Sequence, residues 1–475
     1  MVLQVSCFSE ERIGSNGWVI DTKEPYLAKK GKVQTPVLGL VVRRDMAIEE
    51  FVSKPFYEVL AHLHTHKNEA FTAKWKPSEA CQKWQDEEGR VLSKPLAENV
   101  VGRITGQPGK VISIEKKPKK NPPPLPYNLS ALQIDANKRF SMSAQQVLDT
   151  CQALYEKHKL ITYPRSDCRY LPEEHFREAD AVVSAIMGHC NAFSDAQNAL
   201  DLQKHSKAWN DKKVEAHHAI IPTQKRTNFS SLAKNEQQIY ELIARQYLIQ
   251  FMDDHRYNET NLVVDIAGGI FTARAKQITE QGWKQLFPSN SKNSDETESL
   301  LPDLKEGDQL ICEKGELLEK MTQPPKHFTD ATLLAAMTGI SRYVEDPDVK
   351  KVLKETDGLG TEATRAGIIE LLFKRKFLSR KGKAIHSTET GRALINSLPG
   401  SSSKPDMTAQ WEQSLDKISH KEQSYQMFMG ELSQTLKQLV DYAVTMNTDT
   451  LKNLPAPPAK KGKRRNYKTR KKSNA

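Results

Sequence analysis

Apolar and polar residues alternate along two stretches of the chain, which is typical of strands with one buried face. The first stretch covers residues 56–75. In the second, residues 260–278, a glycine pair at Gly268 and Gly269 predicts a hairpin, and a further strand is expected near residues 310–313. We expect these strands to belong to one sheet.

The middle of the chain shows apolar residues at helical spacing. The prolines of residues 116–126 predict an extended connector into this region, and residues 141–158 then predict a helix. Further helices are expected after Pro172 and around residues 239–247. Tyr163 is therefore predicted to lie on a short connector between two helices.

The last third of the chain is predicted to be helical from residue 326 onward. Thr361 or Thr364 caps one helix, and a hairpin around Lys381 and Gly382 follows it. A helix followed by a basic hairpin is typical of a winged-helix-like nucleic-acid module. An ordinary helix capped by a hairpin would show the same pattern of apolar residues. The chain as a whole is predicted to be a mixed α+β, multidomain protein.

The charge of the protein is concentrated at one end. Its 475 residues include 70 basic and 59 acidic side chains, a formal net charge of +11. Nine basic residues and no acidic one lie in residues 460–472, so the rest of the chain carries only +2 (11 − 9). We expect residues 446–475 to form a disordered basic tail attracted to polyanions, with a purely solubilising end as the alternative.

Cysteine spacing and hydropathy exclude several classes of protein. The six cysteines are scattered without a CxxC pair, which argues against a zinc ribbon or a disulfide framework. The sequence shows no signal peptide and no apolar run of membrane-spanning length. A cytoplasmic protein with no membrane partner is expected.

The stretch LITYPRSDCRY, residues 160–170, surrounds one tyrosine with charge. A phenol has a pKa of about 10 and is a weak nucleophile unless a cation stabilises its phenolate. Arg165 supplies such a cation, and its planar guanidinium fits phosphate oxygens. Asp167, beside Ser166, could orient Arg165, but both residues also suit a plain turn. The segment alone leaves open whether Tyr163 is a nucleophile or a packing residue.

A longer segment around Tyr163, KLITYPRSDCRYLPEEHF, resembles the active-site tyrosine segment of type IA DNA topoisomerases, most closely their bacterial topoisomerase III branch. Five other segments resemble the same family in the same order, at residues 31–45, 124–140, 215–223, 324–334 and 358–378.

This resemblance implies a toroidal type IA topoisomerase core with helical or winged-helix-like domains and a β-rich hinge domain. Residues 1–30 do not resemble the family and are set apart as an N-terminal segment. The implied domains are a discontinuous DNA-binding domain from residues 31–50 and 326–445, a discontinuous hinge or gate domain from residues 51–115 and 256–325, and a catalytic-tyrosine domain from residues 116–255.

The implied activity is transient cleavage of one DNA strand through a 5′-phosphotyrosine at Tyr163, then strand passage and religation, which relaxes or decatenates DNA without ATP. Arg165 would stabilise the transition state, and His217 would contact the scissile phosphate region or assist proton transfer. His218 is the weaker candidate, because neighbouring side chains point to different sides of an element. A nucleoid-associated location in the cytoplasm follows from such an activity.

The resemblance also implies contacts to single-stranded DNA, with capping or solvated residues as the alternative. Lys32 stands where the family usually has arginine, and residues 337–358 resemble an insertion used in decatenation. The implied DNA-binding residues are Lys32, Gln34, Ser166, Asp167, His218, Thr361, Thr364 and Arg365.

One part of the family pattern is missing from the sequence. Members of the family hold Mg²⁺ with a glutamate and a DxDxE cluster of an N-terminal Toprim domain. The only DxD here is formed by Asp346 and Asp348, and it is predicted to be a solvent-exposed stretch without metal. We therefore expect that Mg²⁺ is required and that its acidic ligands are missing from this chain. The chain is then either a truncated product or one fragment of a split enzyme, for which a separate Toprim-containing chain is a candidate partner.

Three other functions fit parts of the sequence. A catalytically impaired remnant that only binds single-stranded DNA would keep the same motifs. A tyrosine recombinase is disfavoured, because Tyr163 lies in the first half of the chain with His217 and His218 after it. A generic RNA-binding protein is compatible with the charge but leaves the ordered series of segments unexplained.

Overall fold

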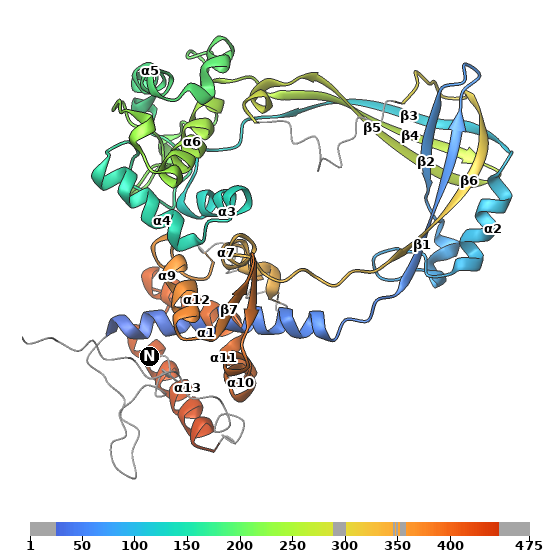
Figure 1. The fold of residues 1–475 in the computed structure, drawn as a ribbon. Helices are drawn as coiled ribbons and strands as arrows, with labels where there is room; N and C mark the ends of the chain where they lie inside the picture. Colours follow the sequence, from blue (N-terminus) through green and yellow to red (C-terminus); the bar gives the residue numbers. More distant parts are fainter. Residues whose placement is uncertain (1–24, 288–300, 345–346, 348–349, 352–357, 446–475) are drawn as a thin grey trace, which may run out of the picture.

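The elements of the chain follow a ring-shaped path, with a β-barrel on one side and two groups of helices on the other (Figure 1). This computed structural model describes residues 25–287, 301–344, 347, 350–351 and 358–445, with side chains from Val33 onward in the first helix. No described helix combines the length and apolarity needed to cross a lipid bilayer. The mixed α+β, multidomain fold predicted from the sequence is confirmed.

Six antiparallel strands form a closed barrel in the order β1-β2-β5-β4-β3-β6. Apolar residues alternate along β1 and β2 and point into the core of the barrel, as their spacing predicts. The predicted hairpin and the single sheet are also confirmed. The elements are β1 (Pro55–His64), β2 (Ala70–Trp75), β3 (Pro108–Asn121), β4 (His255–Ile266), β5 (Gly269–Glu280) and β6 (Gln309–Met321), with α2 (Lys94–Ile104) packed beside β1 and β6 and the short η1 (Glu79–Trp84) and η8 (Gly282–Leu286).

The predicted proline-rich connector is wrong in its first half, because residues 116–121 continue strand β3. Pro118 pairs there with Asn258 of β4. Within β3, only Pro108–Lys110 pair with β6, so the rest of β3 is an edge strand on that side. A proline is tolerated on an edge strand because no partner needs its missing N–H group.

The first group of helices contains Tyr163. Helix α4 starts at its cap, Ser143, whose hydroxyl accepts a hydrogen bond from the backbone of Gln146, and it continues directly into a π-helical turn, η2. Tyr163 lies between η2 and η3, on the predicted connector. The group contains α3 (Leu129–Phe140), α4 (Ala144–Gln152), η2 (Ala153–Lys157), η3 (Glu173–Glu178), α5 (Ala179–His189), η4 (Asn191–Ala199), η5 (Asp211–Lys213), η6 (Phe229–Ser231), α6 (Lys234–Leu248) and η7 (Ile249–Phe251).

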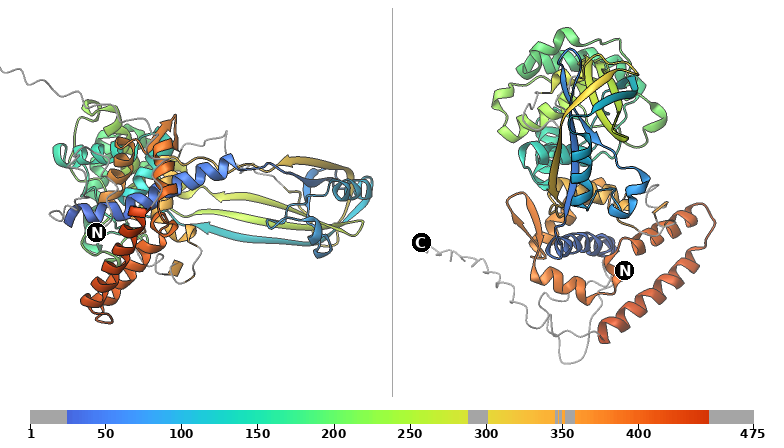
Figure 2. Two further views of the ribbon diagram at one scale, coloured as in Figure 1. Left: turned by 90° about the horizontal axis from the view of Figure 1, so that it is seen from below. Right: turned by 90° about the vertical axis from the view of Figure 1, so that its right-hand side faces the viewer.

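The second group of helices is assembled on α1, which passes across it as one long helix (Figures 1 and 2). The predicted hairpin after α9 is present, with Gly382 at a φ of 60° in its turn. The group contains α1 (Pro25–Glu49), α7 (Asp330–Thr338), η9 (Ile340–Tyr343), α9 (Glu362–Lys374), β7 (Leu378–Lys381), β8 (Ala384–Ser387), α10 (Glu389–Ser397), α11 (Gly400–Ser403), α12 (Asp406–Ser419) and α13 (Tyr425–Thr445).

Contacts between the two helical groups close the ring. Helix α3 packs on α7 and α4 on α9, and a single apolar cluster extends through both groups, whereas the barrel has its own core. Polar contacts add to this interface: the N–H of Ala331 donates to Asn137 Oδ1 at 3.1 Å, and the N–H of Ala144 donates to Asp330 Oδ1 at 3.4 Å. The barrel joins the helical groups through the long strands β3, β4 and β5 on one side and the ends of α1 and β6 on the other (Figure 1).

Candidate active site

The connector that carries Tyr163 is fixed to a second segment far along the chain. The Thr162 N–H donates to Ile221 O at 2.9 Å, and the Ile221 N–H donates to Thr162 Oγ1 at 3.0 Å. The N–H of Thr223 donates to Leu160 O at 2.9 Å. This pairing brings two of the segments singled out in the sequence, around residues 160–170 and 215–223, into one site.

The other end of the connector is anchored to the start of α3. The Leu129 N–H donates to Ser166 O at 3.0 Å, and the Ser166 hydroxyl accepts a hydrogen bond from the N–H of Cys168 at 3.1 Å. Ser166 is 0% exposed. The Ser166 side chain therefore shapes the turn, and its predicted contact with DNA stays a prediction.

The ring of Tyr163 is presented at the surface between two other rings. It is 40% exposed and stacks on His217, with centroids 4.8 Å apart and planes at 20°. Tyr155 of η2 meets it edge-on at 5.9 Å. Among the described residues the Tyr163 hydroxyl has no hydrogen-bond partner, so it is open to a substrate.

The two adjacent histidines point to different sides, as predicted. His217 lies against Tyr163, and its Nδ1 is 4.0 Å from Asp167 Oδ1. His218 points inward, where its Nδ1 donates to Ala219 O at 2.8 Å and its ring meets the edge of His175. Burial lowers the pKa of His218, so this ring is neutral at neutral pH. Of the two, only His217 contacts the Tyr163 ring.

The two arginines of the segment differ in how they are held. Arg169 donates to Pro126 O at 2.9 Å and to Leu125 O at 2.7 Å, so it serves the fold. The half-buried Arg165 has no hydrogen-bond or ion-pair partner within the described part of the chain. The suggested orientation of Arg165 by Asp167 is not observed, because the exposed Asp167 lies beside His217 instead. Arg165 is therefore the guanidinium that is available for a phosphate.

Two predicted DNA-binding residues are part of the interior. Arg365 is 1% exposed and donates to Glu362 Oε1 at 2.7 Å and to Ser130 Oγ at 3.1 Å. Gln34 is also buried, and its Oε1 accepts a hydrogen bond from Arg375 at 2.9 Å. Both side chains are occupied by protein partners in this arrangement, and the predicted DNA contacts of Arg365 and Gln34 stay predictions.

The remaining predicted contacts to DNA stay predictions. Thr364 Oγ1 accepts a hydrogen bond from the Thr361 N–H at 3.0 Å, so this pair caps α9 as the sequence indicates, with Thr361 exposed at the helix start. The side chain of Lys32, much of residues 337–358 and the Asp346–Asp348 pair lie outside the described residues. The basic tail lies outside them as well.

The described residues do not fit the Mg²⁺ ion that the family implies. Mg²⁺ prefers octahedral oxygen ligands from carboxylates and water. Among the described residues, the one group of three close metal-ligand side chains is Asp45, His327 and His386, in which two of the three donors are nitrogens. Sequence analysis missed this group, because its members come from three distant segments and follow no motif spacing.

Comparison with known proteins gives a consistent assignment. The profile of the DNA topoisomerase family matches residues 17–430, which includes the second half of the segment 1–30 that was set apart above. DNA topoisomerase 3 of Haemophilus influenzae is 56% identical over 87% of this chain and 64% of its own length. DNA topoisomerase 3 of Vibrio cholerae is 52% identical over 93% of this chain and 69% of its own length.

The fold itself has a solved counterpart. Full-length topoisomerase I from Thermotoga maritima superposes with a TM-score of 0.61 at 19% identity, covering 87% of this chain and 63% of that chain. The chain thus spans about two thirds of the length of the curated relatives it matches, 64% and 66% for the proteins of H. influenzae and Salmonella typhimurium. On this family match and these identities, the chain belongs to the type IA DNA topoisomerases, in their bacterial topoisomerase III branch.

Proposed function

We propose that this chain is the strand-cleaving part of a type IA DNA topoisomerase and that Tyr163 is its nucleophile. The observation that carries the proposal is the exposed Tyr163 phenol, stacked on His217, with Arg165 two residues on and free of partners among the described residues. A tyrosine that only packed would bury its ring or bond its hydroxyl, whereas Tyr163 is accessible within a connector that is held at both ends.

In the proposed reaction, Tyr163 Oη attacks the phosphorus of one DNA strand. The new bond joins this oxygen to the 5′ phosphate, and the bond from phosphorus to the 3′ oxygen breaks. The phenol gives up its proton, and the 3′ oxygen takes up one proton and leaves as a hydroxyl. His217, in ring contact with Tyr163, assists this proton transfer. Arg165 donates N–H groups to the phosphate oxygens as charge builds up on them. The phosphotyrosine ester conserves the bond energy of the cleaved phosphodiester, so religation needs no ATP.

In the proposed strand passage, a second DNA strand moves through the opened ring. Separation of the two helical groups at the α3–α7 and α4–α9 contacts would open the ring, with the barrel as the hinge, and a second strand would pass before religation. The substrates would be single-stranded segments in supercoiled or catenated duplex DNA. The carboxylates of a Toprim domain would hold the Mg²⁺ that the family implies.

An adduct assay tests the proposal. A single-stranded oligonucleotide labelled at its 3′ end is incubated with the full chain and Mg²⁺, with and without a purified Toprim-containing polypeptide, and the products are separated under denaturing conditions. We expect a labelled protein–DNA adduct that Tyr163→Phe abolishes. Saturable DNA binding without any adduct in either arm would contradict the proposal and establish the binding-only remnant instead.

A further inference from the structure

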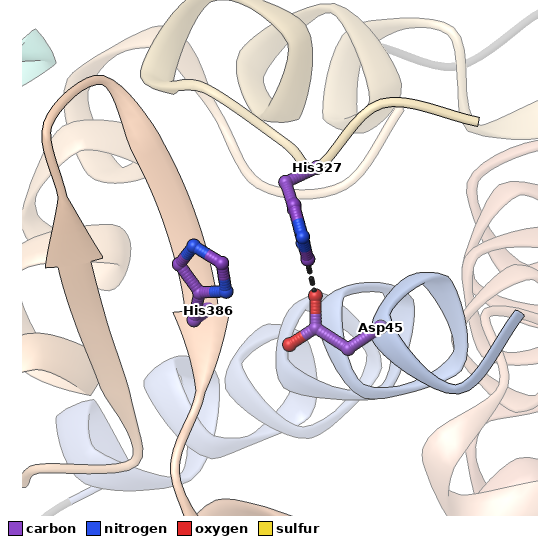
Figure 3. Close-up of side chains that lie close together, drawn as sticks. All are labelled: Asp45, His327 and His386. Carbon is purple, nitrogen blue, oxygen red and sulfur yellow. Dashed lines mark hydrogen bonds and ion pairs between the residues drawn. The ribbon is translucent and has the colours of Figure 1, made fainter. Parts of the chain in front are cut away.

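A group of metal-ligand side chains lies away from the connector of Tyr163, where three segments meet (Figure 3). Asp45 comes from α1, His327 from the link between β6 and α7, and His386 from β8. One ligand atom from each residue lies within 4.8 Å of the others. The two imidazole rings are 4.1 Å apart at their centroids. None of these residues takes part in the proposed cleavage.

The carboxylate of this group is held in a fixed orientation. Asp45 is 0% exposed, and its Oδ2 accepts hydrogen bonds from the Ser387 N–H at 2.6 Å and the Ser387 hydroxyl at 2.7 Å, with Arg392 at 3.8 Å. Its Oδ1 faces His327, whose Nδ1 lies 2.8 Å away (Figure 3). Such outer hydrogen bonds orient a ligand and set its basicity in metal sites.

We propose that Asp45, His327 and His386 bind one divalent transition-metal ion of the Zn²⁺, Co²⁺ or Ni²⁺ class. Two imidazoles and one carboxylate are the donor set that such ions prefer, whereas Mg²⁺ and Ca²⁺ prefer oxygen alone. The His327 side chain is 31% exposed, which leaves room for water to complete the coordination shell.

The distances require only small movements. Ligands about 2.0–2.2 Å from a metal lie roughly 2.8–3.6 Å from one another at octahedral to tetrahedral angles. The 2.8 Å between His327 Nδ1 and Asp45 Oδ1 is already close to this range. The distances from the His386 ring nitrogen to the other two ligand atoms, at most 4.8 Å, would shorten by rotation of the His386 side chain. On binding, the lone pair of His327 Nδ1 faces the metal, and the other ring nitrogen carries the N–H group.

The ion would join three parts of the second helical group. The link that carries His327 also contacts the hairpin directly, because the Ile385 N–H donates to Phe328 O at 2.7 Å. A metal bound here ties α1, this link and β8 together at the point where the barrel strand β6 enters the helices. We therefore expect bound metal to stabilise this junction.

Cobalt titration tests the site, because Co²⁺ coordinated by imidazole has a visible spectrum that reports geometry. The full chain is freed of metals with a chelator and titrated with Co²⁺. We expect one ion per chain, with an affinity that falls at least about tenfold in His327→Ala and in His386→Ala. His205→Ala is the matched control, because His205 pairs with Glu173 at 2.6 Å and belongs to no group of three ligands within the described residues.

Thermal unfolding with and without Zn²⁺ separates lost binding from lost folding. His327→Asn and His386→Asn should unfold near the temperature of the metal-free parent chain but lose the rise in midpoint that Zn²⁺ gives to the parent. An excess of Mg²⁺ should not displace Co²⁺. Equal affinities in all variants, no saturable binding, or the same Zn²⁺-dependent rise in the variants would overturn the proposal.

Discussion

At the scale of single residues, the structure distinguishes two arginines that the sequence presents as equals. Arg169 bonds to backbone carbonyls, whereas Arg165 has no such partner within the described residues. We predict that Arg165→Lys lowers the rate of DNA cleavage about tenfold or more, because lysine keeps the charge but loses the two-pronged phosphate contact. Single-turnover cleavage of a labelled oligonucleotide measures this rate.

The exposed Arg177, twelve residues further on, serves as the control for Arg165. Arg177→Ala should cleave at the parent rate, and Arg165→Lys should unfold at the parent temperature. A parent-like cleavage rate in Arg165→Lys would exclude a role of the guanidinium in the transition state.

The lowered pKa of His218 should make the stability of the protein sensitive to acid. Burial lowers its pKa below the ordinary 6.5, and the neighbouring His175 and His217 act in the same direction. Below pH 6.5 the unfolded chain then binds more protons than the folded chain, so the free energy of unfolding decreases as the pH falls. We expect His218→Asn, which keeps a donor near Nδ1, to lose less stability than the parent between about pH 7 and about pH 5.

Urea unfolding at several pH values measures the effect of His218. The His205→Asn variant changes an exposed histidine and should keep the pH dependence of the parent. If His218→Asn and the parent lose stability in parallel, this histidine is not the buried group that opposes protonation.

The sequence alone predicts some of the site residues and not others. The position of Tyr163 on a connector follows from local helical periods, and the opposite orientations of His217 and His218 follow from their adjacency. The burial of Arg365 depends on Ser130, 235 residues away, which no local pattern contains. The same holds for the Asp45, His327 and His386 group.

At the scale of elements, local patterns predict strands and helices but not their edges. Alternation and the glycine pair are sufficient for the β4–β5 hairpin, because hairpins are determined by neighbouring residues. Pro118 predicts a connector, yet it lies in β3. Beyond Lys110, β3 pairs with β4 on one side and no longer pairs with β6 on the other, so this part of β3 is an edge strand that tolerates proline. Strand pairing between distant segments is a tertiary property.

Hydrogen bonds between α9 and the start of α3 link the two helical groups. The Ser130 N–H at the start of α3 donates to Glu362 Oε2 at 2.7 Å, and Glu362 also pairs with the buried Arg365. Burial raises the pKa of Glu362, while Arg365 and Ser130 oppose that shift. We predict that Glu362→Ala destabilises the protein by about 3 kcal/mol, because it removes a buried carboxylate that accepts hydrogen bonds from both Ser130 and Arg365.

Denaturant unfolding and hydrogen–deuterium exchange measure the loss of Glu362. Exchange should accelerate at the start of α3 and in α9 more than in the barrel, since the barrel has a separate core. The half-exposed Glu370 of α9 gives the control Glu370→Ala, for which we expect little change. Uniform acceleration over the whole chain would contradict a local role at the ring closure.

At the scale of the whole molecule, distant segments of the chain build the barrel and the second helical group, whereas the first helical group is one continuous stretch. The barrel takes β1, β2 and β3 from before the Tyr163 region and β4, β5 and β6 from after it. The resemblance to the family implies this discontinuity, whereas periodicity only suggests that the strands share a sheet. The shared core of the two helical groups was not predicted, since it depends on how the ring closes.

The uneven charge of the molecule predicts how it binds DNA. Residues 460–472 contribute nine of the +11 charges, so removal of residues 460–475 leaves about +2. We predict that this truncation weakens binding to single-stranded DNA at low salt. The slope of log affinity against log salt concentration should become shallower by up to about 0.7 for each lost phosphate contact. Fluorescence titrations at several salt concentrations measure the slope, and an unchanged slope would show that the tail makes no phosphate contacts.

The central claim is that the hydroxyl of Tyr163 forms the covalent bond with DNA. The most direct measurement is mass spectrometry of the trapped adduct after digestion with nuclease and trypsin, which releases the peptide of residues 160–165, LITYPR. We expect this peptide to carry a 5′-nucleotide on Tyr163, and we expect no modified peptide from the Tyr163→Phe chain. A nucleotide on any other residue, or a modified peptide from the Tyr163→Phe chain, would contradict it.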